Sequence, residues 1–510
     1  MRKSGTDHVF RYQESGKRGL SLIYAFLAGA AAVLGFSPVD FFPATLVALV
    51  VLIHLWMRAA SPRVALRIGF FFGLGLYGAG ASWVYVSLNR FGGMPLPLAA
   101  TATLAWCAFL ALFPALAGWI QARIARDSEA PPVLRAALLI PAAWMLIEWP
   151  LSWFLTGFPW LALGYTAIDD PLSGFAPLGG VYAVTLAMAV AAGLLWCAVS
   201  GNVRRTRWIA AGMLAAMLAS GYALRATEWT APVGEPLRVA LLQGNVPQEL
   251  KFDPARYERT LETYARLAED SDARLIVLPE TAVPRFLDLV EPGFLQRLKA
   301  AALRNGGDLL LGIPVRDAAG NYLNSVISMG VSPPATYDKS HLVPFGEFVP
   351  PGFGWIVRVL SIPLADFSRG SIDQRPMAIA GQRVAVNVCY EDAYGAEIIR
   401  QLPEATLLVN VSNVAWFGDS LAPAQHLQIA RMRALETGRV YLTAANTGIT
   451  AAIWPDGSVR QQMPQFSRGL IQFEVRGYSG ATPYVRFGDL PAVLAALLAL
   501  AFVALRGRSR

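Results

Sequence analysis

Eight long apolar segments constrain the fold of this chain more than any other feature of its sequence. Each approaches the length of about 20 mainly apolar residues that a helix needs to cross the hydrocarbon core of a bilayer. We therefore predict a multi-pass α-helical membrane domain with eight spans. The segments lie near residues 20–37, 41–57, 64–88, 96–121, 132–150, 174–199, 207–224 and 487–505.

The composition agrees with this prediction. Hydrophobic residues make up 55% of the 510 residues and charged residues only 15%, whereas a soluble globular chain carries roughly 25% charged residues. The net charge is +8, which raises nucleic-acid binding as one interpretation. The positions of the basic residues along the chain favour a different one.

Basic residues are concentrated in every second connection between the apolar segments. The other short connections hold Arg90 as their one clear case. Because Lys and Arg are enriched in cytoplasmic loops, we predict that both termini are cytoplasmic and that nucleic acid is not a partner. The basic set comprises Arg2, Lys3, Arg11, Lys17, Arg18, Arg58, Arg63, Arg67, Arg123, Arg126, Arg135, Arg204, Arg205, Arg207, Arg506, Arg508 and Arg510.

A segment of soluble-domain composition, 225–486, separates the seventh apolar segment from the eighth. Strand-like and helix-like stretches alternate in it, which predicts an α/β domain with helices covering the sheet. Seven preceding spans would place this domain outside the cytoplasm. We therefore divide the chain into a membrane domain at 1–224, an extracytoplasmic catalytic domain at 225–486, and an eighth span with a basic tail at 487–510.

Cys389 stands where a strand-like segment meets a helix-like one, in VAVNVCYEDAYGAEII (384–399). The thiolate is the nucleophilic form of cysteine, and a helix N-terminus lowers the pKa of a thiol. The sulfur at such a turn can project into a cleft at the strand end. A buried structural cysteine is the alternative, and the local sequence leaves both open.

The other cysteines, Cys107 and Cys197, lie inside apolar segments, where a small buried hydrophobe is the ordinary interpretation. With no CxxC motif and four histidines, we expect neither a metal site nor a cofactor.

Two further segments carry candidate catalytic groups. Glu280 ends the strand-like LIVLPE, and a carboxylate among apolar neighbours is expected to have a raised pKa, which suits a general base. A solvated loop start is the alternative. Lys339 lies in TYDKSHLVPFGEFVPP, where a fixed ammonium could stabilise an oxyanion. Glu347 in the same stretch could pair with Lys339, although an exposed lysine is the ordinary case.

Taken in order, LIVLPE, YDKSHLVPFGE and VNVCYED resemble the Glu–Lys–Cys signature of the nitrilase, or carbon–nitrogen hydrolase, superfamily. Within that superfamily, a domain held between seven spans and one further span resembles the apolipoprotein N-acyltransferase family. The resemblance implies an α-β-β-α sandwich beside the membrane domain. Further matching motifs are TGFPW (156–160), QGNVPQ (243–248), SNVAWFG (412–418), RALETGR (433–439) and NTG (446–448).

The resemblance also implies roles for individual residues. Glu280 would be the general base, Lys339 the oxyanion-stabilising residue and Cys389 the nucleophile. The chain departs from the family pattern at two positions, with Phe252 in place of a Trp and Val414 in place of an Asp. Positions implied to support the site or bind substrate are Glu347, Tyr390, Glu391, Trp416 and Phe252.

The implied activity is a two-step acyl transfer in a bacterial inner membrane, with the catalytic domain on the periplasmic side. The donor would be a membrane phospholipid, phosphatidylethanolamine by the resemblance. The acyl chain would pass through a cysteine thioester to the α-amino group of the diacylglyceryl-cysteine of an apolipoprotein. The loop 151–180, rich in aromatic residues and free of Lys and Arg, could be an interfacial aromatic belt or a lipid-facing wall of the site.

Two other functions stay open from the sequence. A membrane-tethered amide hydrolase would use the same three residues and resolve the thioester with water. A non-enzymatic transporter or receptor is the second alternative, but transporters place ionisable residues within their spans. In this chain the main ionisable residue within the apolar segments is Glu148, near the end of the fifth segment.

Overall fold

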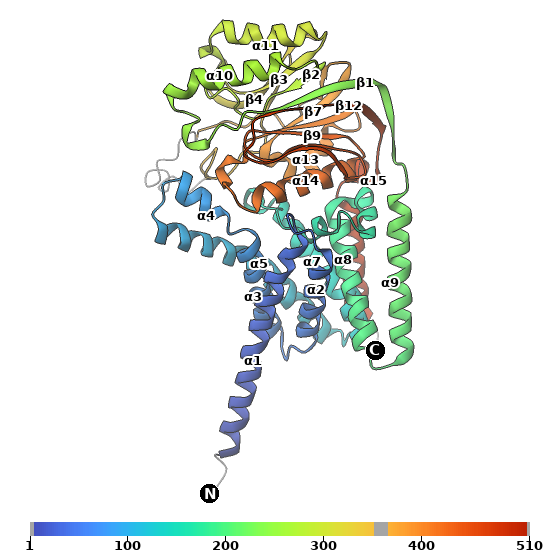
Figure 1. Cartoon of the computed structure of the whole chain (residues 1–510). Coiled ribbons are helices and arrows are strands. Elements are labelled where there is room, and N and C mark those ends of the chain that lie inside the picture. The colour runs from blue at the N-terminus through green and yellow to red at the C-terminus, as the bar shows by residue number, and fades with distance from the viewer. Residues whose placement is uncertain (1–4, 351–365, 507–510) are drawn as a thin grey trace.

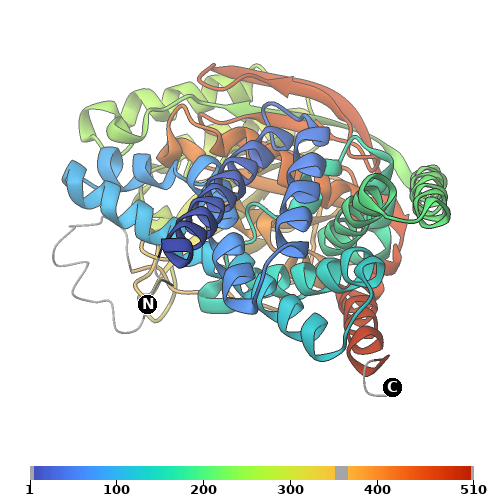
Figure 2. The same ribbon diagram turned by 90° about the horizontal axis from the view of Figure 1, so that it is seen from below.

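The computed structural model describes residues 5–350 and 366–506. A helical bundle carries a two-sheet sandwich on one of its ends (Figure 1). The first helix begins, and the last helix ends, on the side of the bundle that faces away from the sandwich. Seen from below, the bundle helices lie side by side beneath the sandwich (Figure 2).

All eight segments predicted as spans contain helix. The bundle helices are α1 (Gly5–Ala32), α2 (Phe42–Met57), α3 (Pro62–Gly80), α4 (Val84–Val86), α5 (Leu96–Asp127), α7 (Ile140–Glu148), α8 (Ala176–Ser200), α9 (Arg204–Arg225) and α16 (Leu490–Arg506).

The lengths of these helices support part of the predicted set of eight spans. Four stretches are long and apolar enough to cross a membrane alone: Leu96–Asp127, Pro132–Ser152, Pro171–Ser200 and Arg204–Arg225. Pro62–Gly80 and Val84–Phe91 form a pair bent by 56°, which would be a fifth. The described residues thus contain four or five helices that meet the length for a span, and Gly19–Gly35, Phe42–Met57 and Leu490–Arg506 are shorter apolar helices.

Local sequence explains where two of these helices stop. Helix α2 ends at Met57 because the chain turns directly into α3, whose N-cap residue Ser61 accepts a hydrogen bond from the backbone N–H of Val64. Helix α3 ends at Gly80, in a stretch with two glycines, and glycine has low helix propensity. The predicted single segment 64–88 is therefore broken.

Glycines let the first helices of the bundle approach closely. Gly29 of α1 faces the backbone carbonyl of Phe72 in α3, and Gly69 of α3 faces the backbone carbonyl of Pro114 in α5. A side chain at either glycine would collide with that backbone. Small residues at such contacts are typical of helix packing in membranes.

The sandwich is built from two six-stranded sheets, with strand orders β12-β1-β2-β3-β4-β5 and β11-β10-β9-β8-β7-β6. The strands of the first sheet are β1 (Thr230–Gln243), β2 (Leu275–Val277), β3 (Asp308–Arg316), β4 (Tyr322–Gly330), β5 (Thr336–Asp338) and β12 (Gly469–Gly480). Those of the second are β6 (Met377–Ile379), β7 (Gln382–Val388), β8 (Leu407–Ser412), β9 (Tyr441–Ala445), β10 (Thr450–Ile453) and β11 (Val459–Met463).

A single apolar layer joins the two sheets. Val239 and Val277 of the first sheet are buried in the same cluster as Val386, Val409 and Leu442 of the second. Alternate side chains of a strand point to opposite faces, so the remaining apolar residues of each sheet face outward and require cover.

Helices provide that cover on both outer faces. On the first sheet, α10 (Pro254–Glu269) and α11 (Pro292–Arg304) bury their apolar sides, as Leu261 and Leu298 do against Ile276. On the second sheet, the cover includes α13 (Gly395–Ile398) and α14 (Ala422–Thr437). The expected α-β-β-α order of layers is confirmed.

The strands at the centre of each sheet are parallel. β1, β2 and β3 pair in parallel in the first sheet, and β7, β8 and β9 in the second. The carboxyl ends of parallel strands meet at one edge of a sheet, where functional groups of α/β folds gather. Glu280 follows β2 and Cys389 follows β7.

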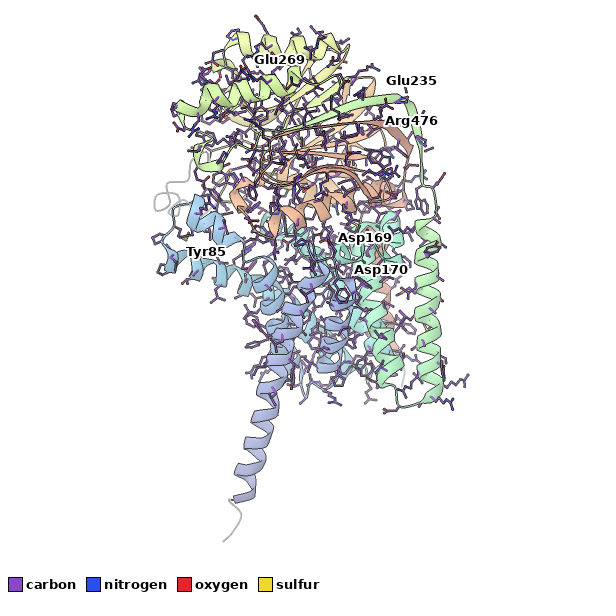
Figure 3. All side chains as sticks on the ribbon, in the orientation of Figure 1. Tyr85, Asp169, Asp170, Glu235, Glu269 and Arg476 are labelled. Atoms are coloured by element: carbon purple, nitrogen blue, oxygen red, sulfur yellow. The ribbon has the colours of Figure 1, made fainter. Side chains whose placement is uncertain are left out.

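Helix α14 lies between the second sheet and the bundle (Figure 1). Its residues Ile429 and Met432 are buried in one apolar cluster with Trp160 and Val181 of the preceding part of the chain. Arg431 forms an ion pair with Asp169 at the junction of the two parts, where Figure 3 labels that aspartate. The apolar sequence of 345–366 predicts a loop that dips into lipid or forms a lid, and most of this stretch, 351–365, lies outside the described residues.

Candidate active site

The chain turns sharply at Cys389. This residue begins a 3₁₀ turn, Cys389–Ala393, directly after β7, and its φ of 53° lies in the left-handed region that side chains other than glycine rarely adopt. Such strain clusters at functional sites. The predicted strand end is confirmed, but the amphipathic helix expected over 393–403 is reduced to the four residues of α13 and short 3₁₀ turns.

The sulfur environment differs from the expectation of a thiolate stabilised by a helix N-terminus. Burial raises the pKa of Cys389 to about 12, and the carboxylate of Glu280 adds to the effect, whereas Lys339 opposes it. The expectation of a lowered thiol pKa is wrong, because no long helix starts here and a carboxylate lies nearby. Cys389 is therefore a thiol at neutral pH, and a nearby base must remove its proton during attack.

Glu280 and Lys339 lie together in the interior. The Nζ atom of Lys339 is 3.4 Å from Oε1 of Glu280 and 2.9 Å from the carboxylate of Glu347. Asn324 of β4 donates one hydrogen bond to Oε1 of Glu280 at 2.7 Å and one to Oε1 of Glu347 at 2.8 Å. Lys339 is 1% exposed, so the alternative of an ordinary exposed lysine is wrong.

These contacts determine the direction in which the pKa values of Glu280 and Lys339 shift. Burial alone would raise the pKa of Glu280, but the ammonium groups of Lys339 and Lys251 and the amide of Asn324 lower it overall. The expectation of a raised pKa is therefore wrong, because it considered only the apolar neighbours in sequence. Burial opposes the charge of Lys339, yet Glu280 and Glu347 raise its pKa above the ordinary value. The ammonium of Lys339 thus lies between the carboxyl groups of Glu280 and Glu347, and Glu280 and Lys339 both act electrostatically on the thiol of Cys389.

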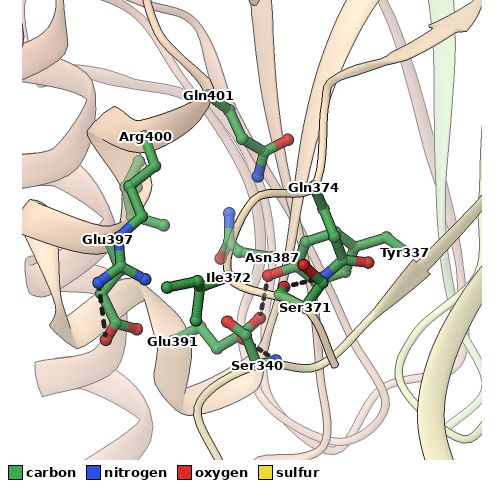
Figure 4. Close-up of a pocket in the computed structure, with 11 residues that line it drawn as sticks. Tyr337, Ser340, Ser371, Ile372, Gln374, Asn387, Glu391, Glu397, Arg400 and Gln401 are labelled. Carbon is green, nitrogen blue, oxygen red and sulfur yellow. Dashed lines mark hydrogen bonds and ion pairs between the residues drawn. The ribbon is translucent and has the colours of Figure 1, made fainter. Parts of the chain in front are cut away.

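Glu391 joins the turn at Cys389 to the loop that carries Lys339. Its Oε1 accepts hydrogen bonds from the backbone N–H groups of Ser340 and His341 at 2.7 and 3.0 Å. Its Oε2 accepts from the backbone N–H of Val388 at 2.7 Å and from the hydroxyl of Tyr337 at 3.0 Å. Figure 4 shows Glu391 pointing toward Tyr337 and Ser340 across a small pocket. The carboxylate thus fixes the relative position of Lys339 and Cys389.

Tyr390 points from the same turn toward the loop 151–180. Its hydroxyl donates to the carbonyl of Gly157 at 3.0 Å, and the hydroxyl of Tyr394 donates to that carbonyl at 3.1 Å. The ring of Tyr390 stacks on Trp160, with centroids 6.1 Å apart. The TGFPW motif is therefore in direct contact with the residue that follows Cys389.

The remaining predicted residues lie farther out. Phe252 is an exposed side chain. Trp416 contacts the bundle, with its ring 5.9 Å from that of Phe91 and its carbonyl accepting a hydrogen bond from Ser87 at 2.7 Å. Val414 is buried and lies against Gly448, so no charged group occupies the position where an Asp was expected.

Sequence reasoning missed two residues of the centre. Asn324 bridges the two carboxylates, but it lies in an unremarkable polar stretch of β4 and gave no signal. Lys251 is 3% exposed, and its Nζ donates to the carbonyl of Glu280 at 3.3 Å. Burial lowers the pKa of Lys251 to about 8, although Glu280 and Cys389 act in the opposite direction. Lys251 directly precedes Phe252 and lies close to the QGNVPQ motif, and this position in the sequence could have indicated that Lys251 belongs to the site.

The part of the chain that the structure describes contains no group of three or more His, Cys, Asp and Glu side chains able to hold a metal ion. Cys107 and Cys197 are buried in α5 and α8 and form no disulfide. The groups that the centre brings together are the thiol of Cys389, the carboxylate of Glu280 and the ammonium of Lys339.

Two protein-family models match most of the chain. A family model described as the apolipoprotein N-acyltransferase N-terminal domain matches residues 28–194, and a carbon–nitrogen hydrolase model matches residues 238–484. The chain is also similar to a carbon–nitrogen hydrolase structure from Helicobacter pylori, at 17% identity and a TM-score of 0.37, over 54% of this chain and 96% of that one.

Two curated relatives match almost the whole chain. The apolipoprotein N-acyltransferase of Nitrosomonas europaea is 49% identical over 94% of this chain and 96% of its own length. That of Ralstonia nicotianae is 44% identical over 93% of this chain and 91% of its own length. Because both relatives are more than 40% identical and match over 90% of each chain, the chain belongs to the apolipoprotein N-acyltransferase family.

Proposed function

We propose that this protein transfers an acyl chain from a membrane phospholipid, through a thioester on Cys389, to the N-terminal amino group of a diacylglyceryl-cysteine in an apolipoprotein. The observation that carries the proposal is the buried ion pair of Lys339 and Glu280 next to the thiol of Cys389. This centre occurs in a chain whose family relatives are named for that acyl transfer.

In the first half-reaction, Glu280 accepts the proton of the Cys389 thiol as the sulfur attacks the ester carbonyl carbon of the phospholipid. The carbonyl oxygen becomes an oxyanion, which Lys339 stabilises. The tetrahedral intermediate collapses, the bond to the lysophospholipid oxygen breaks, and Glu280 returns the proton to that oxygen. The acyl group stays on the sulfur as a thioester.

In the second half-reaction, the α-amino group of the acceptor attacks the thioester carbonyl carbon. Glu280 accepts a proton from the attacking nitrogen, the C–S bond breaks, and the proton returns to the sulfur. The products are an amide and the free thiol. A thioester reacts readily with amines whereas an oxygen ester does so poorly, which explains why a cysteine precedes amide formation.

The membrane domain has a physical reason to lie beside this site. Exposing an acyl chain to water costs about 0.8 kcal/mol per CH₂, so a site near the bilayer lets the chains stay in lipid. The loop 151–180 carries three exposed apolar residues, Trp153, Phe154 and Leu155, directly before the Gly157 that Tyr390 contacts. We assign this loop to the wall along which the donor chain enters, with phosphatidylethanolamine as the donor.

The topology is part of the proposal. Residues 1–224 and 487–510 form the membrane domain, with the bent and short helices completing eight spans, and 225–486 form the catalytic domain. Helix α1 begins and helix α16 ends on the side of the bundle away from the sandwich (Figure 1), and enrichment of Lys and Arg in cytoplasmic loops assigns the basic connections to the cytoplasmic side. This orientation puts the catalytic domain on the periplasmic face of the inner membrane.

The two alternative functions, a transporter or receptor and an amide hydrolase, are not favoured. Glu148 is the main ionisable residue of the apolar segments. Its carboxylate accepts hydrogen bonds from the indole N–H of Trp144, the backbone N–H of Leu163 and the hydroxyl of Thr185. It stabilises the loop after its own helix and is not placed like a transport site. An amide hydrolase would use the same centre, but this family's relatives are acyltransferases.

The direct test uses the full chain in nanodiscs that contain phosphatidylethanolamine, together with a synthetic diacylated lipopeptide. Mass spectrometry of the peptide should show one added acyl chain, and the variant Cys389→Ala should give none. Release of free fatty acid without acylated peptide would identify the hydrolase instead. Nanodiscs with phosphatidylglycerol in place of phosphatidylethanolamine test the choice of donor.

A further inference from the structure

A pair of oppositely charged side chains lies directly behind the nucleophile. His426 belongs to α14, and Asp392 belongs to the turn that begins at Cys389. The Nε2 atom of His426 is 3.1 Å from Oδ2 of Asp392 and 3.4 Å from the carbonyl oxygen of Cys389. Both side chains are buried, with Asp392 fully so. The assigned mechanism gives neither residue a part.

The surroundings favour the protonated form of His426. Within the described residues, neither carboxylate oxygen of Asp392 has a hydrogen-bond partner outside the ion pair. A buried carboxylate needs an opposite charge, and His426 is the cation in contact with it. Burial opposes the imidazolium, but Asp392, the carbonyl of Cys389 and Glu280 stabilise it, so that the pKa of His426 is raised.

The imidazole is also held from the side of the bundle. Trp160 stacks on it with ring centroids 5.8 Å apart and planes inclined by 19°. The indole N–H of Trp160 in turn donates to Oε1 of Gln425 at 2.8 Å, the residue before His426. A ring stacked on one face and paired through Nε2 has little freedom to rotate.

The carbonyl that this imidazole reaches belongs to the strained residue of the site. Cys389 has a φ of 53°, which an ordinary side chain adopts only when its surroundings impose it. Its carbonyl oxygen also accepts a hydrogen bond from Nδ2 of Asn410 at 3.0 Å. Two donors from separate elements, β8 and α14, therefore meet on one backbone oxygen.

We propose that His426 is a positioning residue for the acyl transfer. Paired with Asp392, it holds the carbonyl of Cys389 together with Asn410, and it thereby keeps the sulfur directed toward Glu280 and Lys339. The inference rests on the proposed function, in which Cys389 is the nucleophile. Because the same sulfur geometry serves both half-reactions, loss of His426 lowers kcat while KM for the phospholipid stays unchanged.

The test compares four variants of the full chain in phosphatidylethanolamine nanodiscs: His426→Ala, His426→Gln, Asp392→Asn and the double variant His426→Gln with Asp392→Asn. Single-turnover acylation of Cys389 is followed by intact mass, and thermal unfolding is recorded for each. A misplacement of about 1 Å at a reacting atom costs roughly 10²-fold in rate, so His426→Ala should acylate about 10²-fold more slowly. His54→Ala, at a half-buried histidine of α2, is the matched control and should leave the rate unchanged.

The double variant separates positioning from simple stability. His426→Gln keeps a donor for the carbonyl of Cys389 but leaves the carboxylate of Asp392 without its cation, and Asp392→Asn removes that charge. The double variant should acylate at least tenfold faster than His426→Ala. If His426→Ala acylates within threefold of the wild type, or if its loss follows the fraction unfolded and the double variant recovers nothing, the inference is wrong.

A second readout distinguishes this outcome from failure of the proposed function. Alkylation of Cys389 by iodoacetamide needs the same base and the same sulfur position but no lipid. His426→Ala should slow it, and an unchanged alkylation rate would overturn the positioning role. A wild type that is alkylated but never acylated by phospholipid would count against the proposed function alone.

Discussion

The ammonium group of Lys339 lies 2.9 Å from the carboxylate of Glu347, and only 1% of the lysine side chain is exposed. The Oε1 atom of Glu280 lies 3.4 Å from the Nζ atom of the same lysine. One buried cation is thus shared by two carboxylates, one buried and one partly buried. This arrangement keeps the lysine charged throughout the reaction and leaves Glu280 ionised, ready to accept the proton of Cys389.

Replacing Lys339 with Met should abolish thioester formation and destabilise the protein. The change leaves the buried carboxylate of Glu280 and the partly buried one of Glu347 without their cation, and breaking a buried pair costs about 3–5 kcal/mol. The double variant Lys339→Met with Glu347→Gln removes one of those charges. It should regain part of the lost thermal stability while remaining inactive, as measured by unfolding in detergent and by intact mass. Equal stability of the single variant and the wild type would contradict the buried ion chain.

Glu280→Gln should separate catalysis from stability. Glutamine can still accept the hydrogen bond from Asn324 but cannot take a proton, and loss of a general base lowers rates by about 10²–10⁴-fold. Single-turnover acylation by the folded protein should fall by that amount, whereas the unfolding temperature falls only as far as loss of the ion pair with Lys339 requires. An acylation rate within a few-fold of wild type would exclude Glu280 as the base.

The lowered pKa of Glu280 predicts a pH dependence of stability. A carboxyl group whose folded-state pKa is below its unfolded value stabilises the fold above the unfolded pKa and loses that contribution as the pH falls through the folded one. The unfolding temperature of the wild type should therefore fall below about pH 4.5 more steeply than that of Glu280→Gln. Parallel curves for the two proteins would contradict the assigned ionisation.

Lys251→Met should be more stable than the wild type and less active. Burial lowers the pKa of Lys251 from 10.5 to about 8. The charged lysine therefore lowers the free energy of unfolding at neutral pH by about 3 kcal/mol. Since its folded pKa is below its unfolded value, the penalty shrinks as the pH rises from 8 to 10.5. The stability gain of Lys251→Met should thus be largest at pH 7 and smaller at pH 10, while acylation slows because one cation near Cys389 is lost.

Tyr390→Phe and Tyr394→Phe form a matched pair on the carbonyl of Gly157. Each substitution removes one of two hydrogen bonds to that oxygen, and each should cost about 1 kcal/mol. The double variant should lose more than the sum, because the buried carbonyl then lacks both donors. Tyr390→Phe should slow acylation more than Tyr394→Phe does, since Tyr390 follows the nucleophile. Additive losses in stability would show that the two bonds are independent.

The central strands could be predicted from the sequence because they are short, continuous apolar runs bounded by polar turns. RVAVNVCY and ATLLVNVSN correspond to β7 and β8, and both are buried on two faces. The edge strands escaped prediction for the opposite reason. Val459–Met463 is largely polar and exposed, and only its pairing with β10 makes it a strand.

The apolar segments predicted where helices form but not how long each one is. Glycine breaks and tight connections depend on packing between helices, as at Gly80 and Ser61. Membrane crossing by the shorter helices therefore stays a prediction.

At the site, the order of the motifs indicated which residues converge, but not their ionisation. The pKa of Glu280 depends on Lys339 and Lys251, which arrive from distant parts of the chain, and the pKa of Cys389 depends on burial and on Glu280. Local neighbours alone led to the wrong direction for both groups. The contribution of Asn324 was likewise invisible without the fold.

The most direct test of the account is the intact mass of the protein after incubation with phosphatidylethanolamine and no acceptor. The wild type should gain the mass of one acyl chain, hydroxylamine should remove it, and Cys389→Ala should gain nothing. An unmodified wild type, or an acyl adduct that persists in Cys389→Ala, would contradict the thioester on Cys389.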